Sequence, residues 1–209
     1  MSPKHRTCDD AAGIPDPKAI EVLLTRVLLH GVMSGAYRKY VTSIGLRGDE
    51  RVLDYGSGSG AAARHLVKVL QAGGGRLTCV DVSPAWQAAL RKTLAGYDVD
   101  YALGDIRRLG VPRGSFDVVV MHWMFHDVPA ADRRAVLDEL ARLLRPGGRL
   151  ATREPTRREE GIPASQLRGL LQDAGLRELR GFEASAFMMG PYYSGVWEKP
   201  VAPNPGDPA

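Results

Sequence analysis

RVLDYGSGSG, residues 51–60, is the stretch that decides the fold. Its apolar start predicts a short strand. Three alternating glycines follow: Gly56, Gly58 and Gly60. They predict a turn in which the backbone is bare, because side chains would obstruct such a turn. The run AAARHLVKVLQA, residues 61–72, is rich in helix formers, so its free N-terminal N–H groups favour an anionic or carboxylate-bearing ligand of nucleotide type.

The glycine spacing alone fits two kinds of cofactor site. Gly56, Gly58 and Ala61 match the G-x-G-x-x-G/A fingerprint of dinucleotide-binding proteins. Asp54 and the third glycine instead give D-x-G-x-G-x-G, which resembles motif I of the class I S-adenosylmethionine-dependent methyltransferases. In that family the acidic residue helps to position the methionine end of the cofactor. The resemblance implies that the cofactor contacts five residues of this loop: Asp54, Gly56, Ser57, Gly58 and Gly60.

A second acidic residue ends the next predicted strand, RLTCVDV, residues 76–82. The carboxylate of Asp81 can accept two hydrogen bonds from a ribose diol, as expected for an adenosine-containing cofactor. Ser83 and Pro84 predict the N-cap and first position of a helix. The segment from Asp81 onward, DVSPAWQAALR, is similar to the one after the second strand in many class I methyltransferases, which implies a cofactor contact for Val82 as well.

A third acidic residue, Asp105, follows a predicted strand at residues 99–103. The resemblance implies that Asp105 accepts a hydrogen bond from the adenine amino group and that the amide of Ile106 meets the ring edge. An ionised carboxylate offers no donor, so Asp105 would favour adenine over guanine at that edge.

The fourth predicted strand, residues 116–121, is a continuous apolar run typical of the buried centre of a parallel sheet. In the resembling family the acceptor site lies just beyond this strand. The resemblance therefore implies cofactor contacts for Met121 and His122 and an acceptor contact for Trp123. His126 and His122 are candidate catalytic bases, because imidazole titrates near neutrality. His126 is favoured, since a loop beyond a strand projects over the pocket.

The remaining segments complete the predicted fold. LLRPGGRL, residues 143–150, predicts a helix end and a tight turn into a fifth strand. Residues 176–182 and 192–197 predict two last strands with no helix between them, so they should pair antiparallel. We expect an α/β, Rossmann-like three-layer sandwich with a seven-stranded, mostly parallel sheet and an antiparallel last strand.

The domain organisation follows from the ends of the chain. Residues 1–17 and 200–209 are polar and rich in proline, and predict flexible tails around a single methyltransferase domain at 18–199. Two helices within 18–48 should cap this domain. Candidate acceptor contacts outside the fourth-strand region are Tyr37, Tyr40 and Arg153. Arg153 begins a predicted loop at 153–161, where Arg153, Arg157 and Arg158 could hold an acidic substrate. Alternatively, Glu159 and Glu160 pair with these arginines in a solvated loop.

Composition excludes several classes. The net charge of +4 is spread along the chain, and the two cysteines, Cys8 and Cys79, show no metal-ligand spacing. No stretch reaches the roughly 18 apolar residues of a membrane span. We therefore expect a cytoplasmic protein with no metal, no nucleic-acid partner and no membrane insertion, as a monomer or homodimer.

The functional hypothesis is an S-adenosyl-L-methionine-dependent methyltransferase that acts on an O, N, S or C atom of a small molecule and releases S-adenosyl-L-homocysteine. The segment after the fourth strand lacks the N/D-P-P-Y/F pattern of enzymes that methylate adenine or glutamine amino groups. One alternative is an NAD-dependent oxidoreductase, although the chain has no Y-x-x-x-K pair. Another is a protein that binds S-adenosylmethionine without transferring its methyl group.

Overall fold

The computed structural model describes residues 17–18, 20–22, 24, 28–157, 161–186 and 189–201. The predicted tails at 1–17 and 200–209 lie almost wholly outside these ranges, as does much of the first predicted N-terminal helix. Two residues of that helix, Ile20 and Leu24, are described with mostly exposed side chains, so neither belongs to the core. None of the helices in the described ranges has the length and apolar character of a bilayer crossing.

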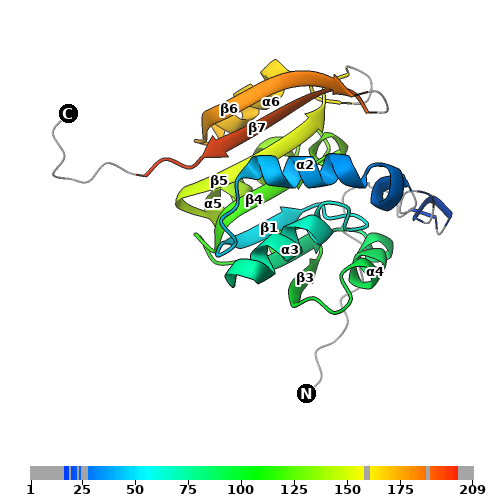
Figure 1. Cartoon of the computed structure of the whole chain (residues 1–209). Coiled ribbons are helices and arrows are strands. Elements are labelled where there is room, and N and C mark those ends of the chain that lie inside the picture. The colour runs from blue at the N-terminus through cyan, green and yellow to red at the C-terminus, as the bar shows by residue number, and fades with distance from the viewer. Residues whose placement is uncertain are drawn as a thin grey trace.

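One sheet of seven strands forms the middle of the molecule, in the order β3-β2-β1-β4-β5-β7-β6 (Figure 1). The strands are β1 (Arg51–Tyr55), β2 (Arg76–Asp81), β3 (Val99–Leu103), β4 (Phe116–His122), β5 (Leu144–Pro155), β6 (Arg177–Ala186) and β7 (Gly190–Glu198). β1 to β5 pair in parallel, and β7 runs antiparallel to both β5 and β6. The predicted seven-stranded sheet with an antiparallel last strand is confirmed.

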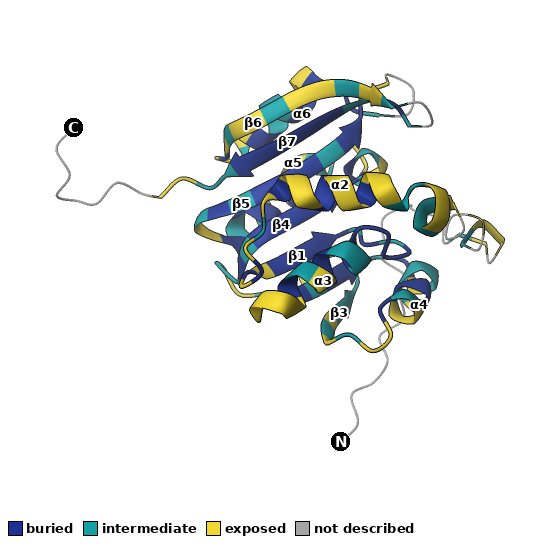
Figure 2. Ribbon diagram, in the orientation of Figure 1, coloured by how far each residue is buried: buried dark blue, intermediate teal, exposed yellow. Residues whose placement is uncertain are grey.

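Helices cover both faces of this sheet. They are α2 (Ser34–Ile44), α3 (Ala63–Gly73), α4 (Pro84–Thr93), α5 (Arg133–Leu143) and α6 (Ala164–Asp173), with short turns η1 (Leu28–Val32), η2 (Ile106–Arg108) and η3 (Phe125–Asp127). α2 and α3 pack on the near face in Figure 1, and α5 and α6 pack behind. The buried strands therefore lie between two apolar layers (Figure 2).

Local signals in the sequence explain the start of α4. The Ser83 side chain accepts a hydrogen bond from the Trp86 N–H at 3.1 Å, and Pro84 occupies the first turn. These contacts confirm the predicted cap. They place the beginning of α4, and with it Trp86, at the carboxyl end of β2.

The fifth strand is longer than the sequence indicated. β5 continues to Pro155, so the prediction that residues 153–155 belong to a loop is wrong. Leu150, Thr152 and Glu154 alternate on one side of the strand and are all fully buried. Pairing explains the extension, because β4 pairs with the strand as far as Arg153 and β7 pairs with it as far as Pro155.

Candidate functional site

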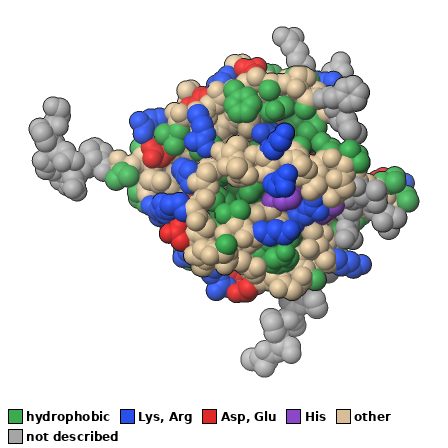
Figure 3. Space-filling model, viewed as in Figure 1, with side chains coloured by type: hydrophobic (Ala, Val, Ile, Leu, Met, Phe, Trp, Pro, Cys, Tyr) green, Lys and Arg blue, Asp and Glu red, His purple; other side chains and the backbone are tan. Residues whose placement is uncertain are grey.

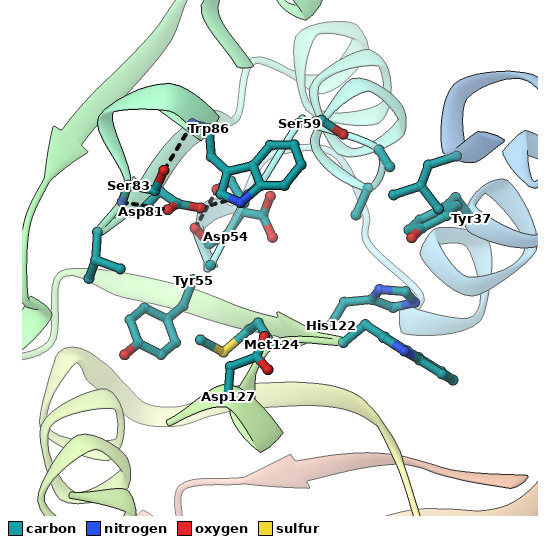
Figure 4. Close-up of a pocket in the computed structure, with 18 of the residues that line it drawn as sticks. Tyr37, Asp54, Tyr55, Ser59, Asp81, Ser83, Trp86, His122, Met124 and Asp127 are labelled. Atoms are coloured by element: carbon teal, nitrogen blue, oxygen red, sulfur yellow. Dashed lines mark hydrogen bonds between the residues drawn. The ribbon is translucent and has the colours of Figure 1, made fainter. Parts of the chain in front are cut away.

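A cavity of about 540 Å³ opens at the carboxyl ends of β1, β2 and β4. The strand order reverses between β1 and β4, which is where open α/β sheets bind ligands. Figure 4 shows Asp54, Asp81 and Trp86 on one side of the cavity and Met124, His122 and Asp127 on the opposite side. A cavity of this size accommodates a nucleoside-sized ligand with room for a smaller molecule beside it.

The three glycines of the loop after β1 have different surroundings. All have positive φ: 71° at Gly56, 51° at Gly58 and 87° at Gly60. A Cβ on Gly58 would meet nothing within 4 Å, and Gly58 lines the cavity. A Cβ on Gly60 would lie 2.8 Å from Leu90 of α4, so Gly60 permits helix packing and is not part of the cavity wall. Gly58 is thus the position where a ligand can approach bare backbone.

Asp81 ties the glycine loop to the start of α4. Its Oδ2 accepts a hydrogen bond from the Gly58 N–H at 2.8 Å, and its Oδ1 accepts one from the Ser83 N–H at 2.9 Å (Figure 4). The side chain is buried and lines the cavity. A carboxylate in this position orders the loop and also presents negative charge to a ligand with hydroxyl donors.

Asp54 is a buried carboxyl without a complete set of partners. It is 2% exposed, and its Oδ2 has no hydrogen-bond partner in the part of the chain that the structure describes. Burial raises the pKa of Asp54 to about 7, and the negative charge of Asp81 adds to this rise. Because Asp54 also lines the cavity, a cationic or hydrogen-bond-donating part of a ligand would satisfy it.

This raised pKa leads us to expect a pH-dependent stability. The Asp54 carboxyl loses its proton near 3.8 in the unfolded chain but keeps it to about pH 7 in the folded protein. Between these values the folded state holds the extra proton. The free energy of unfolding should therefore fall as pH rises, by on the order of 4 kcal/mol. We expect Asp54→Asn to abolish this fall, measured by urea unfolding from about pH 4 to about pH 7.

A matched control is Asp100→Asn, because Asp100 lies on β3 with 55% of its side chain exposed. This variant should keep the wild-type dependence on pH. If Asp54→Asn also keeps the wild-type dependence on pH, the Asp54 carboxyl does not hold its proton in the folded protein. The raised pKa of Asp54 is then refuted.

Aromatic side chains form the wall beyond β4. The His122 ring centroid lies 4.9 Å from that of Tyr37 and 4.3 Å from that of Tyr40. Burial, followed by the charge of Arg153, lowers the pKa of His122 to about 3, so its imidazole is neutral and a weak base at neutral pH. The next residue, Trp123, has a φ of 55°, which is strained for a bulky residue and directs its ring into the wall.

Glu154 holds the segment that follows this wall. Its fully buried carboxylate accepts hydrogen bonds from the N–H groups of Met124 at 3.1 Å, Phe125 at 3.0 Å and His126 at 3.3 Å. His126 Nδ1 lies 2.8 Å from the same carboxylate. Burial lowers the pKa of His126, but the Glu154 hydrogen bond and the charges of Glu154 and Asp127 outweigh it, so the net shift is upward. These contacts favour a positioning role for His126.

We expect Glu154→Ala to lower the free energy of unfolding by about 3 kcal/mol or more, since it leaves buried donors on three successive residues without an acceptor. Glu154→Gln keeps one acceptor oxygen and should lose less. Urea unfolding measures both, with Glu183→Ala as control because 59% of the Glu183 side chain is exposed. Equal, small losses for the two Glu154 variants would contradict this anchoring role.

The structure brings many of the sequence-predicted site residues together. Nine of them line the cavity: Tyr37, Asp54, Gly56, Ser57, Gly58, Asp81, Val82, His122 and Trp123. Seven do not: Tyr40, Gly60, Asp105, Ile106, Met121, His126 and Arg153. Ile106 and Met121 are fully buried in the core. Both oxygens of Asp105 accept hydrogen bonds from Arg107, which also pairs with Asp132, so the Asp105 carboxylate is directed toward this arginine. The roles assigned to all sixteen residues stay predictions.

Several cavity residues were not among those predicted. Trp86 lies in the first turn of α4, and its position just after the Ser83 cap was a usable signal, since first turns of such helices face the carboxyl edge of the sheet. Met124 and Asp127 lie within the segment already singled out after β4. Arg157, which the sequence offered as one of three loop arginines for an acidic substrate, also lines the cavity.

Comparison with known proteins also singles out the part of the chain that contains the glycine loop after β1. A family model described as a methyltransferase domain matches residues 53–152. The chain is 32% identical over 157 residues to prosolanapyrone synthase of Alternaria solani. This match covers 66% of this chain and 6% of that protein. The chain is also 32% identical over 146 residues to a demethylmenaquinone methyltransferase of Beutenbergia cavernae. This match covers 69% of this chain and 58% of that protein.

A solved structure with the same fold is the N-methyltransferase NodS from Bradyrhizobium japonicum, in complex with S-adenosyl-l-homocysteine. Its TM-score is 0.68 at 18% identity, with 83% of this chain and 88% of that chain covered. An identity this low establishes likeness of fold alone. The chain spans less than two thirds of the length of the two curated relatives named above.

Proposed function

We propose that the chain is a class I S-adenosylmethionine-dependent methyltransferase that binds S-adenosylmethionine in this cavity and transfers the methyl group to a small-molecule acceptor. The observation that carries the proposal is the placement of two buried carboxyl groups, Asp54 and Asp81, around the open backbone at Gly58. The orphaned Oδ2 of Asp54 fits the cationic amino group of this cofactor.

The surrounding residues suit the parts of that cofactor. Asp54 would bind the amino-acid part, and Asp81 the ribose hydroxyls. Val82 and Trp86 line the cavity next to Asp81 and offer an apolar wall for a flat base. In this proposal Val82 and Trp86 take the place of Asp105, whose oxygens are engaged by Arg107.

When bound, the cofactor supplies a methyl group already activated by its sulfonium, so alignment and desolvation of the acceptor can provide most of the catalysis. Tyr37, His122 and Trp123 would exclude water from the side of the cavity beyond β4. With its pKa lowered to about 3, His122 would position the acceptor and not take its proton. His126 would act through the Glu154 contact that orders this segment.

The test is incubation of the chain with isotopically labelled S-adenosylmethionine and a panel of small acceptors, followed by mass spectrometry. Transfer of the labelled methyl group to an acceptor, with release of S-adenosylhomocysteine, would support the proposal. Binding of the cofactor without transfer to any acceptor would favour the binding-only alternative. Turnover of NAD with a small substrate would favour the oxidoreductase alternative.

A further inference from the structure

Arg153 is a half-buried arginine held between two aromatic rings. Its Cζ lies 4.6 Å from the centroid of the Tyr40 ring and 4.9 Å from that of Tyr192. Its Nε donates a weak hydrogen bond of 3.4 Å to the Ser194 hydroxyl. Within the described ranges of the chain, no carboxylate forms an ion pair with this guanidinium.

Two other partly buried arginines, Arg107 and Arg168, are neutralised by carboxylates. Arg107 pairs with Asp105 and Asp132, and Arg168 pairs with Glu178 and Glu183. A partly buried cation with only ring faces around it loses hydration without gaining a counter-ion. The Tyr40 and Tyr192 rings recover a part of this loss, and an incoming anion would recover more.

A row of aromatic rings leads from the cavity to Arg153 and beyond. Ring centroids are 5.9 Å apart for His122 and Trp123, 6.1 Å for Trp123 and Tyr192, and 6.4 Å for Tyr192 and Phe182. His122 and Trp123 line the cavity, whereas Phe182 on β6 is 52% exposed. The row therefore connects the cavity wall with the surface of the sheet.

β6 lies at the edge of the sheet, and each of its residues is exposed or half-buried. α2 lies in front of β4 and β5, and β7 and β6 extend past it on the same face (Figures 1 and 2). In the same view, Figure 3 shows hydrophobic side chains close to Lys and Arg side chains around the His near the middle of this face. A molecule lying on the ring row would thus reach solvent at one end and the cavity at the other.

We propose that this row is the acceptor subsite and that the acceptor is a planar aromatic carboxylic acid. Its ring packs against Trp123 and Tyr192, and its carboxylate pairs with Arg153. Two features select this chemistry: ring faces favour a flat apolar body, and one planar guanidinium matches one carboxylate. The inference rests on the proposed function, because it takes the adjoining cavity as the site of the methyl donor.

The test compares two probes of the same shape, 2-naphthoate and its neutral analogue 2-naphthamide, by calorimetric titration of the full chain with and without S-adenosylhomocysteine. We expect the acid to bind the wild-type protein about 10-fold more tightly than the amide, since one charge-assisted contact is worth roughly that factor. Arg153→Gln should make the two affinities equal. Arg153→Lys keeps the charge and should keep part of the preference.

The control variant is Arg134→Gln. Arg134 is an exposed residue that pairs with Asp138, and both lie on α5, which covers the face of the sheet opposite to the ring row. It should keep the full preference for the acid. Tyr192→Leu should weaken the binding of acid and amide alike, which separates ring packing from charge. Thermal unfolding shows whether each variant is folded.

Equal binding of acid and amide by the wild-type protein would overturn the inference. A preference for the acid that survives Arg153→Gln would overturn it as well. Failure of S-adenosylhomocysteine to bind would instead overturn the proposed function. The titrations without S-adenosylhomocysteine then still show whether Arg153 selects the carboxylate, so the two failures are distinguishable.

Discussion

Gly58→Val is expected to lower the affinity for S-adenosylhomocysteine by about 1,000-fold or more, measured by isothermal titration calorimetry. A Cβ at this position would find open space within 4 Å, and Gly58 lines the cavity. The branched side chain would therefore occupy the volume of the ligand. It would also strain the backbone, because φ is 51°.

Gly74→Val is the matched control for the backbone strain that Gly58→Val introduces. Gly74 has a φ of 82° at the end of α3, and a Cβ there also meets nothing within 4 Å, but Gly74 does not line the cavity. This variant should lose a similar amount of stability and keep its affinity. Near-normal affinity of Gly58→Val would show that the glycine loop does not contact the cofactor.

Asp81→Ala is expected to weaken S-adenosylhomocysteine binding by about 100-fold or more, because two effects add. The ribose hydroxyls lose a charged acceptor, and the N–H groups of Gly58 and Ser83 lose the carboxylate that orders the loop. Asp81→Asn keeps one acceptor oxygen and should lose less. Calorimetry measures the affinities, and thermal unfolding shows whether the variants are folded.

Asp105→Ala provides the comparison for Asp81→Ala. The sequence resemblance implies an adenine contact for Asp105, whereas its carboxylate accepts hydrogen bonds from Arg107 and lies outside the cavity wall. We therefore expect a loss of less than about 10-fold. A loss as large as that of Asp81→Ala would restore the direct adenine contact, and an unchanged affinity of Asp81→Ala would refute its place in the site.

Most of the fold could be predicted because its signals are local. The apolar run before Met121 and the glycine turn after Tyr55 are each typical of one structure, and the strands β1, β3 and β4 begin where the sequence indicated. The antiparallel β7 followed from the missing helix before it. The end of β5 could not be predicted from the sequence, because polar residues such as Glu154 are typical of loops. Only the pairing with β7 keeps the last residues of this strand extended.

The candidate site likewise contains residues that could be predicted from the sequence and contacts that could not. Asp54, Gly58 and Asp81 could be found from spacing, because Asp54 and Gly58 lie close together at the end of β1 and Asp81 ends the adjacent parallel strand. The contacts of His126 could not be found from spacing, because its partner Glu154 lies on β5, 28 residues further along the chain. The burial of the His122 ring also could not be read from the sequence, and this burial lowers the pKa of His122 and weakens it as a base.

The most direct test of the proposed site is calorimetric titration of the wild-type chain with S-adenosylhomocysteine and, in parallel, with NAD. We expect one molecule of S-adenosylhomocysteine to bind per chain with a dissociation constant on the order of 10 µM or below, and NAD to bind at least about 100-fold more weakly. Binding of NAD with equal or higher affinity, or no binding of S-adenosylhomocysteine, would contradict the assignment of this cavity to the methyl donor.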